Sequence, residues 1–207
     1  INNDERVNKK LKVVFVENYC VSWAELLTPA AEISEQISLA GTEASGTSNM
    51  KFMINGAVTL GTLDGANVEI NEAVGRDNIL LFGMTTPQVN SLKQGGYNPR
   101  HHYNNNPVLH SVIDELGRGI GGKNFKGLYD ALMNADQYMA LADFDSYAQA
   151  QRYAAEIYKD KEKWNRMSLV NIAKSGIFAA DRAIKEYEDK IWLGTPVPVK
   201  APKSKKQ

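Results

Sequence analysis

The stretch GTEASGTSNMKFMINGAVTLGTLDG, residues 41–65, predicts the fold around it. Small residues, hydroxyls, one carboxylate and one lysine precede an apolar segment, and a second glycine-flanked turn follows. Gly46 permits backbone angles that other residues resist, and Thr47, Ser48 and Asn49 are favoured N-cap residues, so we expect a helix to begin here. The unpaired N–H groups at the start of a helix suit a phosphate group. The stretch therefore predicts a ligand-binding loop that leads into a helix.

Lys51 lies in the first turn of this predicted helix, where a cation opposes the helix dipole. From the residues alone two interpretations remain open. Lys51 is either a surface lysine on an amphipathic helix or a lysine bound as an imine to an aldehyde cofactor. Its neighbours in the sequence are apolar, which predicts that Lys51 is buried. These neighbours are Met50, Phe52, Met53 and Ile54.

Short apolar segments alternate with predicted helices through the first part of the chain, which indicates an α/β fold with a parallel sheet. The expected strands are residues 13–16, 57–60 and 78–82. The expected helices are residues 21–28, 32–39 and 66–74, with Gly75 ending the last of them. In such sheets ligands bind at the carboxyl ends of the strands.

After residue 85 the composition becomes typical of helices. We expect helices over residues 88–94, 107–116, 125–134, 145–158, 161–173 and 181–192, and a loop over residues 98–106. The chain is thus divided into three parts. We expect residues 1–85 to hold α/β strands and helices with the key loop, residues 86–195 to form a helical C-terminal region of the same domain, and residues 196–207 to form a flexible basic tail.

Composition excludes several classes of function. Lysine plus arginine equals aspartate plus glutamate, so no basic footprint for nucleic acid is expected. No apolar run approaches the roughly 18 residues of a membrane span. Cys20 is the one cysteine, which suits a reducing compartment such as the cytoplasm. Three histidines without a spaced carboxylate cluster, His101, His102 and His110, do not predict a metal site.

The chain resembles the α-glucan (glycogen or starch) phosphorylases. The likeness is carried by GTEASGTSNMKFMINGAVTLGTLDGANVEI without a gap, by VVFVENYCVSWAELLTPAAEISEQIS before it, and by GRDNILLFGM, GYNP and WNRMSLVNIAKSGIFAADRAIKEY after it. It extends to about Trp192. The resemblance implies that Lys51 holds pyridoxal 5′-phosphate as a Schiff base and that Thr47 and Ser48 contact the cofactor's phosphate. It also implies the fold of glycosyltransferase type B (GT-B), with residues 1–85 as the later strands and helices of its C-terminal Rossmann-like domain.

Further site residues follow from the resemblance. Tyr19 is either a packing residue or, as in the family, a residue beside the pyridine ring; Cys20 departs from the family's Asn or Arg. Glu43 is, from its residue type alone, a solvated carboxylate. In the family it accepts hydrogen bonds from sugar hydroxyls, and the backbone of Ala44, Ser45 and Gly46 contacts the glucosyl unit. A charged acceptor beside fixed N–H donors is suited to a sugar.

The implied reaction is phosphorolysis, in which inorganic phosphate cleaves a terminal α-1,4-linked glucose from a glucan and gives α-glucose 1-phosphate with retention. The family's chain is several times longer, so we expect this chain to be inactive without the remaining N-terminal portion. The resemblance allows a homodimer, and a plastid is the alternative to the cytoplasm. Two other functions stay open: a non-catalytic carbohydrate- or partner-binding module, and a nucleotide-sugar glycosyltransferase, against which the context of Lys51 argues.

Overall fold

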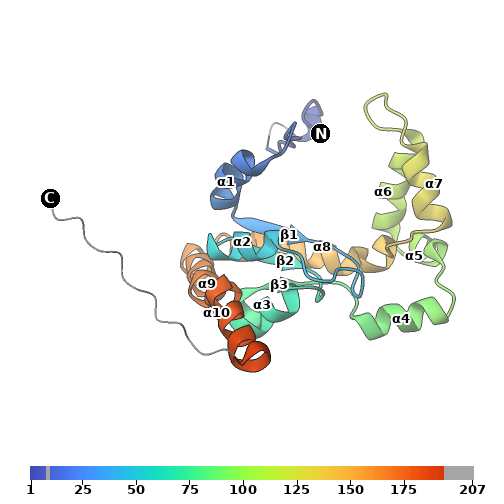
Figure 1. The fold of residues 1–207 in the computed structure, drawn as a ribbon. Helices are drawn as coiled ribbons and strands as arrows, with labels where there is room; N and C mark the ends of the chain where they lie inside the picture. The colour runs from blue at the N-terminus through green and yellow to red at the C-terminus, as the bar shows by residue number, and fades with distance from the viewer. Residues whose placement is uncertain (8–9, 194–207) are drawn as a thin grey trace, which may run out of the picture.

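A three-stranded parallel sheet lies at the centre of the fold (Figure 1). The computed structural model describes residues 1–7 and 10–193. The strands, in their order across the sheet, are β1 Ile33–Gln36, β2 Val58–Gly61 and β3 Leu80–Leu81. Ile33 lies opposite Val58, and Leu60 lies opposite Leu80. The connections are α2 Ser48–Ile54 and, between β2 and β3, α3 Asn67–Val74 with the 3₁₀ turn Arg76–Asn78. This alternation confirms the predicted α/β class.

Most of the remaining described chain is helical. The helices are α1 Val21–Ala30, α4 Thr86–Gln94, α5 Pro99–Asn105, α6 Pro107–Arg118, α7 Lys126–Asn134, α8 Ala140–Ile157, α9 Lys161–Lys174 and α10 Ala180–Tyr187. Short 3₁₀ turns span Glu5–Val7 and Ser175–Phe178, and a π-helical turn, Glu188–Trp192, continues α10. The predicted tail, residues 196–207, lies outside the described residues.

Alternate residues of the strands face opposite layers of helices. Leu80 and Phe82 pack with β2 side chains against α8 and α9, where Trp164 and Met167 are buried. The residues that alternate with them, Ile79 and Leu81, belong to a second cluster. That cluster contains Met53 of α2, Ile70 and Val74 of α3, and partly buried residues from α9 and the following turn. This period of two is the pattern expected of strands covered on both faces.

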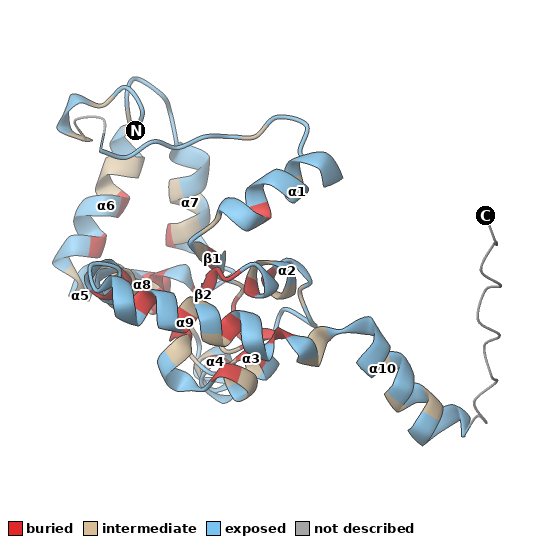
Figure 2. Ribbon diagram, turned by 90° about the vertical axis from the view of Figure 1, so that its left-hand side faces the viewer, coloured by how far each residue is buried: buried red, intermediate tan, exposed pale blue. Residues whose placement is uncertain are grey.

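Burial is concentrated around this sheet (Figure 2). A further cluster, formed by Leu39, Ala40, Val89 and Met139, joins the loop after β1 to α4 and to the start of α8. Helices α5, α6 and α7 pack around Leu109, Ile113, Met133 and Leu141. By contrast α1 and α10 are mainly exposed (Figure 2).

The prediction of a strand over residues 13–16 is wrong. This segment is not assigned to a strand, and Val14 and Phe15 are 64% and 86% exposed. The side-chain amide of Asn2 takes the place of a neighbouring strand, since it donates to the Val13 carbonyl at 2.6 Å and accepts from the Val13 N–H at 2.7 Å. An apolar run predicts burial, but sheet pairing needs a neighbouring strand that local sequence does not specify.

Two other element predictions are wrong. Residues 32–39, expected to be helical, contain β1, because pairing with the fully buried β2 outweighs helix propensity. The expected loop over residues 98–106 is largely α5. The Asn98 side chain accepts a hydrogen bond from the Arg100 N–H at 3.0 Å, and Pro99 occupies the first turn.

Asp143 is a buried carboxylate where α8 meets the end of β3. Its Oδ1 accepts a hydrogen bond from the Met84 N–H at 2.9 Å. Burial is the main cause that raises the pKa of the Asp143 carboxyl above 3.8; the Met84 hydrogen bond opposes this shift, and the nearby Asp136 charge adds to it. A carboxyl whose pKa is raised by folding favours the folded state at low pH, and this contribution is lost as the pH rises through the folded-state pKa.

We therefore expect Asp143→Asn to retain the acceptor for Met84 while removing the cost of a buried charge. At pH 7 its free energy of unfolding should equal or exceed that of the unchanged chain. Asp143→Ala should lose about 1–3 kcal/mol, because the Met84 N–H is left without an acceptor. Denaturant unfolding at pH 4 to 7 checks this. A loss of stability in Asp143→Asn as large as that in Asp143→Ala would contradict it.

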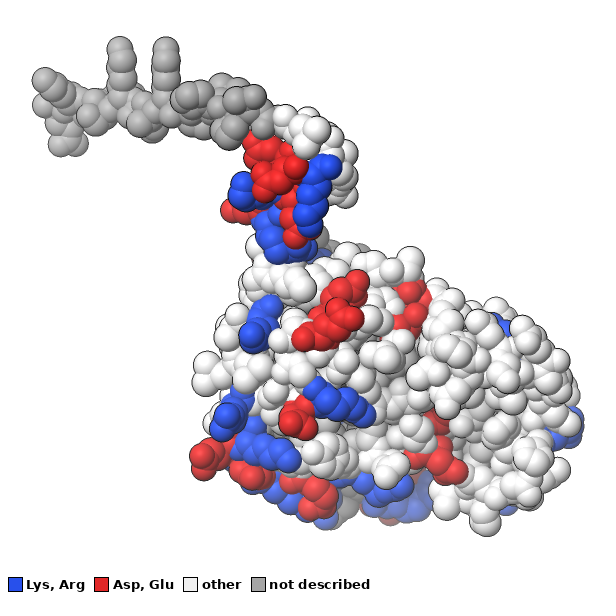
Figure 3. Space-filling model, turned by 90° about the horizontal axis from the view of Figure 1, so that it is seen from below, with Lys and Arg blue, Asp and Glu red and all other residues white. Residues whose placement is uncertain are grey.

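The last described helix carries charges of both signs. Lys185 pairs with Asp189 at 3.2 Å and Lys190 pairs with Glu186 at 3.1 Å. Figure 3 shows acidic and basic side chains side by side on this helix.

None of the described helices combines the length and apolar character that a membrane span requires.

Candidate functional site

The predicted ligand loop lies at the carboxyl edge of the sheet. It follows β1, and the turn of residues 62–66 follows the neighbouring strand β2. Because parallel strands end on the same side of a sheet, the two connections meet there. Asp64 joins them: its Oδ2 accepts hydrogen bonds from the Thr42 N–H at 3.1 Å and from the Glu43 N–H at 2.8 Å. The Thr42 hydroxyl also donates to the Leu39 carbonyl at 2.6 Å.

The next two residues of the turn approach the same loop. The Ala66 N–H donates to the Ser45 carbonyl. Gly65 has φ +50°, and a Cβ added there would lie 2.5 Å from the Ser45 carbonyl oxygen and 3.0 Å from Glu43 Cγ. Only glycine allows the two backbones to come this close.

We expect Gly65→Ala to destabilise the chain by about 1–3 kcal/mol through the strained backbone and to displace the loop as well. Gly121→Ala is the matched control, because Gly121 has φ +57° and no atom within 4 Å of an added Cβ. Both variants should show the backbone cost in thermal unfolding. Only Gly65→Ala should change the amide NMR shifts of residues 42–46; equal changes in both variants would refute the close approach.

The start of α2 is held by a chain of buried amides. Asn49 Nδ2 donates to Asn67 Oδ1 at 3.0 Å, and Asn67 Nδ2 donates to the Thr62 carbonyl at 2.9 Å. The Thr62 hydroxyl donates to the Ser38 carbonyl at 2.6 Å. Asn49 and Asn67 are 2% and 3% exposed, so these hydrogen bonds are shielded from water. The turn after β2 therefore contacts both the loop and the helix that follows the loop.

The residues predicted to bind glucose form the exposed side of this arrangement. Glu43, Ala44 and Ser45 are exposed, and the Ser45 N–H donates to Glu43 Oε1 at 3.4 Å. Gly46 has φ +77°, the left-handed conformation that its residue type anticipated. A small polar hollow lies beside them, lined by Gln36, Ser38, Glu43, Ser45, Asn49, Thr62, Asp64 and Asn67.

Sequence reasoning missed part of this hollow. It treated Asp64 and Gly65 as a turn only and gave Asn67 no role. The signal is a carboxylate and an amide directly after one parallel strand, which lie beside the loop that follows the neighbouring strand. It could not be used, because the residues that form β1 were predicted to be helical. In the structure Asp64 accepts from the Thr42 and Glu43 N–H groups, and Asn67 accepts from the Asn49 side chain.

The predicted helix start is confirmed, but the predicted burial of Lys51 is wrong. α2 begins at Ser48 with Thr47 as its N-cap, and Thr47, Ser48 and Lys51 are all exposed. The buried face of α2 carries Asn49 and Met53, which are four residues apart. Lys51 is two residues from each and therefore points to the opposite side of the helix. Its amine is open to solvent in this chain.

Tyr19 lies in an exposed segment before α1. Tyr19 precedes α1 and is 64% exposed, directly after Asn18, whose φ is +50°. Within the described residues no aromatic contact or hydrogen bond joins Tyr19 to Lys51. Cys20 is exposed as well. The role of Tyr19 stays a prediction.

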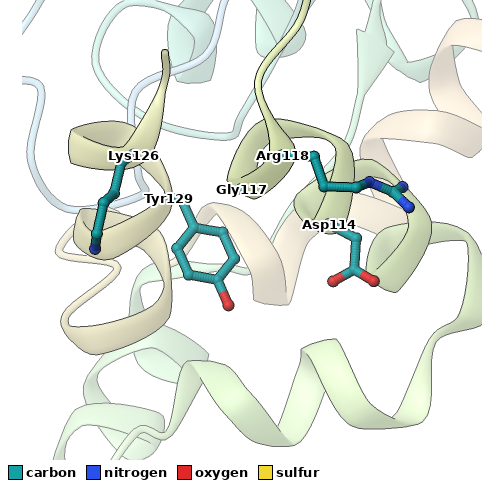
Figure 4. A pocket seen from close by; sticks show the side chains of 5 residues that line it. All are labelled: Asp114, Gly117, Arg118, Lys126 and Tyr129. Atoms are coloured by element: carbon teal, nitrogen blue, oxygen red, sulfur yellow. The ribbon is translucent and has the colours of Figure 1, made fainter.

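A second surface hollow lies away from this edge, between α6 and α7 (Figure 4). It is lined by Asp114, Gly117, Arg118, Lys126 and Tyr129. Lys126 pairs with Asp130 at 2.6 Å. Asp114 accepts a hydrogen bond from the Tyr103 hydroxyl at 2.6 Å, which raises the pKa of Tyr103 to about 12. None of the residues predicted for glucose or for the cofactor lies in this hollow.

The histidines near α5 make aromatic contacts. His110 stacks on Tyr103 with ring centroids 4.1 Å apart, and the rings of His101 and His102 lie edge to face at 5.7 Å. Among the described residues no group of three His, Cys, Asp or Glu side chains is placed to hold a metal ion.

Comparison with known proteins identifies the family. The model of the phosphorylase family, described as carbohydrate phosphorylase, matches residues 1–193. The chain belongs to the carbohydrate phosphorylase family. Glycogen phosphorylase of Haemophilus influenzae is 52% identical over 201 residues, and that of Synechocystis sp. is 47% identical over the same length. The muscle form of glycogen phosphorylase from Homo sapiens is 46% identical over 196 residues.

The match covers only part of the length of these phosphorylases. It covers 95% of this chain but 24% of the Haemophilus influenzae protein, and 93% of this chain but 23% of the human protein. The chain therefore spans about a quarter of the length of the curated relatives it matches. The expected resemblance is confirmed at the level of the family.

Proposed function

We propose that this chain is the part of an α-glucan phosphorylase that holds pyridoxal 5′-phosphate and supplies the loop that binds the glucosyl unit. The reaction is phosphorolysis of a terminal α-1,4-linked glucose to α-glucose 1-phosphate. Family membership supports the proposal, and one observation carries it: at the carboxyl edge of the sheet, Asp64 holds the loop at Glu43 and Asn67 holds the start of α2 at Asn49. The proposal includes the GT-B architecture and the division of the chain after residue 85.

Binding of glucose is assigned to Glu43 and the backbone after it. Glu43 is exposed, and its backbone N–H donates to Asp64 at 2.8 Å. The backbone of Glu43 is therefore held in place, while its side chain is free to turn toward a sugar. Hydrogen bonds from sugar hydroxyls to a charged oxygen are stronger than those to a neutral one. The backbone of Ala44, Ser45 and Gly46 lies exposed or half-exposed beside it.

The residues present fit the cofactor on one side. The Lys51 amine is exposed, and the exposed hydroxyls of Thr47 and Ser48 precede it in the same segment. When bound, pyridoxal phosphate supplies a phosphate monoester with a second pKa near 6, suited to proton exchange close to neutral pH. Lys51 would tether the group, Thr47 and Ser48 would contact its phosphate, and Tyr19 would flank its ring.

The opposite wall of the site is assigned to the remaining N-terminal portion of a phosphorylase. Exposed apolar side chains before and within α1 give that portion a surface to cover, notably Val14, Phe15, Trp23 and Leu26. Burial of such side chains stabilises an interface. The substrates of the assembled protein are the glucan, inorganic phosphate and glucose 1-phosphate. A homodimer and a cytoplasmic location complete the proposal.

A chimera tests this function. The corresponding segment of the Haemophilus influenzae glycogen phosphorylase, 52% identical, is replaced by this chain and purified with pyridoxal phosphate. We expect the chimera to release glucose 1-phosphate from glycogen and phosphate, and the 207-residue chain alone to release none. A folded chimera without phosphorolysis, together with glucan binding by the chain alone, would instead support a non-catalytic binding module.

A further inference from the structure

The turn after β2 contacts two neighbouring segments through different side chains. Asp64 accepts from the N–H groups of Thr42 and Glu43, on the glucose side. Asn67 bonds Asn49, on the side of α2. Both side chains are buried, at 9% and 3% exposure, and both line the small polar hollow beside Glu43.

We propose that Asp64 and Asn67 are positioning residues with separate effects, Asp64 on glucose affinity and Asn67 on cofactor retention. This inference rests on the proposed function. Asp64 fixes the direction in which Glu43 leaves the backbone, because one carboxylate oxygen binds two successive N–H groups at 3.1 and 2.8 Å. Without the Asp64 carboxylate, the Glu43 side chain is still present but the direction in which it leaves the backbone is no longer fixed.

Asn67 acts one segment further along. It bridges the Asn49 amide and the Thr62 carbonyl at 3.0 and 2.9 Å, and Asn49 directly follows Ser48. Loss of the Asn67 amide would leave Asn49 Nδ2 without its acceptor in a buried place, which α2 can relieve by shifting. Such a shift displaces Thr47, Ser48 and Lys51 together, whereas Glu43 remains fixed by Asp64.

The first test is kinetic and uses the chimera. Asp64→Ala should lower kcat/KM for glucose 1-phosphate at least about tenfold, mainly through KM, with cofactor content unchanged, because charge-assisted hydrogen bonds of this kind are strong. Asp64→Asn should restore most of the loss, since its Oδ1 can still accept. In the background of Glu43→Ala, Asp64→Ala should add less than about twofold, because both changes remove the same contact.

Asn67→Ala should give the opposite pattern. The fraction of chimera that keeps the cofactor after dialysis should fall severalfold, while KM for glucose 1-phosphate in the fully loaded protein stays unchanged. Asp77→Ala and Asn90→Ala are the matched controls, because both side chains are exposed. Additive effects of Asp64→Ala and Glu43→Ala, or loss of cofactor in Asp64→Ala, would overturn the assignment.

A second measurement does not depend on activity. In the 207-residue chain, Asp64→Ala should speed hydrogen exchange at the Thr42 and Glu43 amides by about tenfold or more, since each loses its acceptor. Asp77→Ala should leave both rates unchanged, and Asp64→Asn should lie between. Unchanged exchange in Asp64→Ala would overturn the inference. An inactive parent chimera with the expected exchange pattern would count against the proposed function but not against the role of Asp64 in the loop.

Discussion

Replacing Lys51 with arginine in the chimera is expected to remove phosphorolysis. Arginine keeps the positive charge and much of the length of lysine, but its guanidinium stays protonated and cannot form the covalent bond that an amine forms with an aldehyde. Lys51 is exposed, so this change should cost little stability. We expect the rate to fall by about 100-fold or more, the range found when one group that stabilises a transition state is removed.

The measurement is the initial rate of glucose 1-phosphate release, together with cofactor content per chain. Lys93→Arg is the matched control, because Lys93 is an exposed lysine on α4 outside the proposed site. The control should retain full activity and full cofactor content. Equal activity of Lys51→Arg and Lys93→Arg would show that the reaction does not need the Lys51 amine.

Glu43→Ala is expected to lower kcat/KM for glucose 1-phosphate by about 10- to 100-fold. Hydrogen bonds to a charged group contribute about 1.5–3 kcal/mol, and each 1.4 kcal/mol corresponds to a factor of ten. The kcat/KM of Glu43→Gln should lie between those of Glu43→Ala and the parent chimera, because an amide retains one acceptor oxygen without the charge. Both variants should keep the cofactor, since Glu43 lies on the glucose side of the loop.

Steady-state kinetics in the direction of glucan synthesis measure this effect. Glu69→Ala serves as the control, because Glu69 is an exposed glutamate on α3. Its kinetic constants should match those of the parent chimera. If Glu43→Ala changed stability as much as it changed kcat/KM, the carboxylate would be a structural group and the glucose assignment would fail.

Local sequence predicted the loop and the helix after it because their signals are local. The helix start depends on Gly46 and the hydroxyl residues directly after it, and β2 is marked by its own apolar residues. The same reasoning failed where the outcome depends on distant partners. Residues 13–16 have the composition of a strand, yet in the described structure the Asn2 side chain satisfies the backbone of Val13.

Two misses had signals that could have been used. Asn98 followed by Pro99 is the same N-cap and first-turn pair that Asn106 and Pro107 form at α6, and it starts α5 in the same way. Lys51 was expected to be buried because its neighbours in sequence are apolar. Helical spacing gives the better prediction, since the buried Asn49 and Met53 place Lys51 on the opposite side of α2.

Asp64 was missed for a different reason. Its role depends on two strands being adjacent and parallel, with β1 and β2 paired from Ile33 to Gln36. Local patterns predicted β2 but not β1, so the loop after β1 could not be placed beside the turn after β2. The resemblance to phosphorylases supplied Glu43 and Lys51 as candidates, and the structure added the residues that hold their backbone.

The central claim is that Lys51 carries the cofactor, and borohydride reduction tests it most directly. The active chimera is reduced, digested and analysed by peptide mass. We expect one phosphopyridoxyl group on the peptide that contains Lys51 and none on the peptide that contains Lys93. An unmodified Lys51 in a reduced chimera that still phosphorolyses glycogen before reduction would contradict the account.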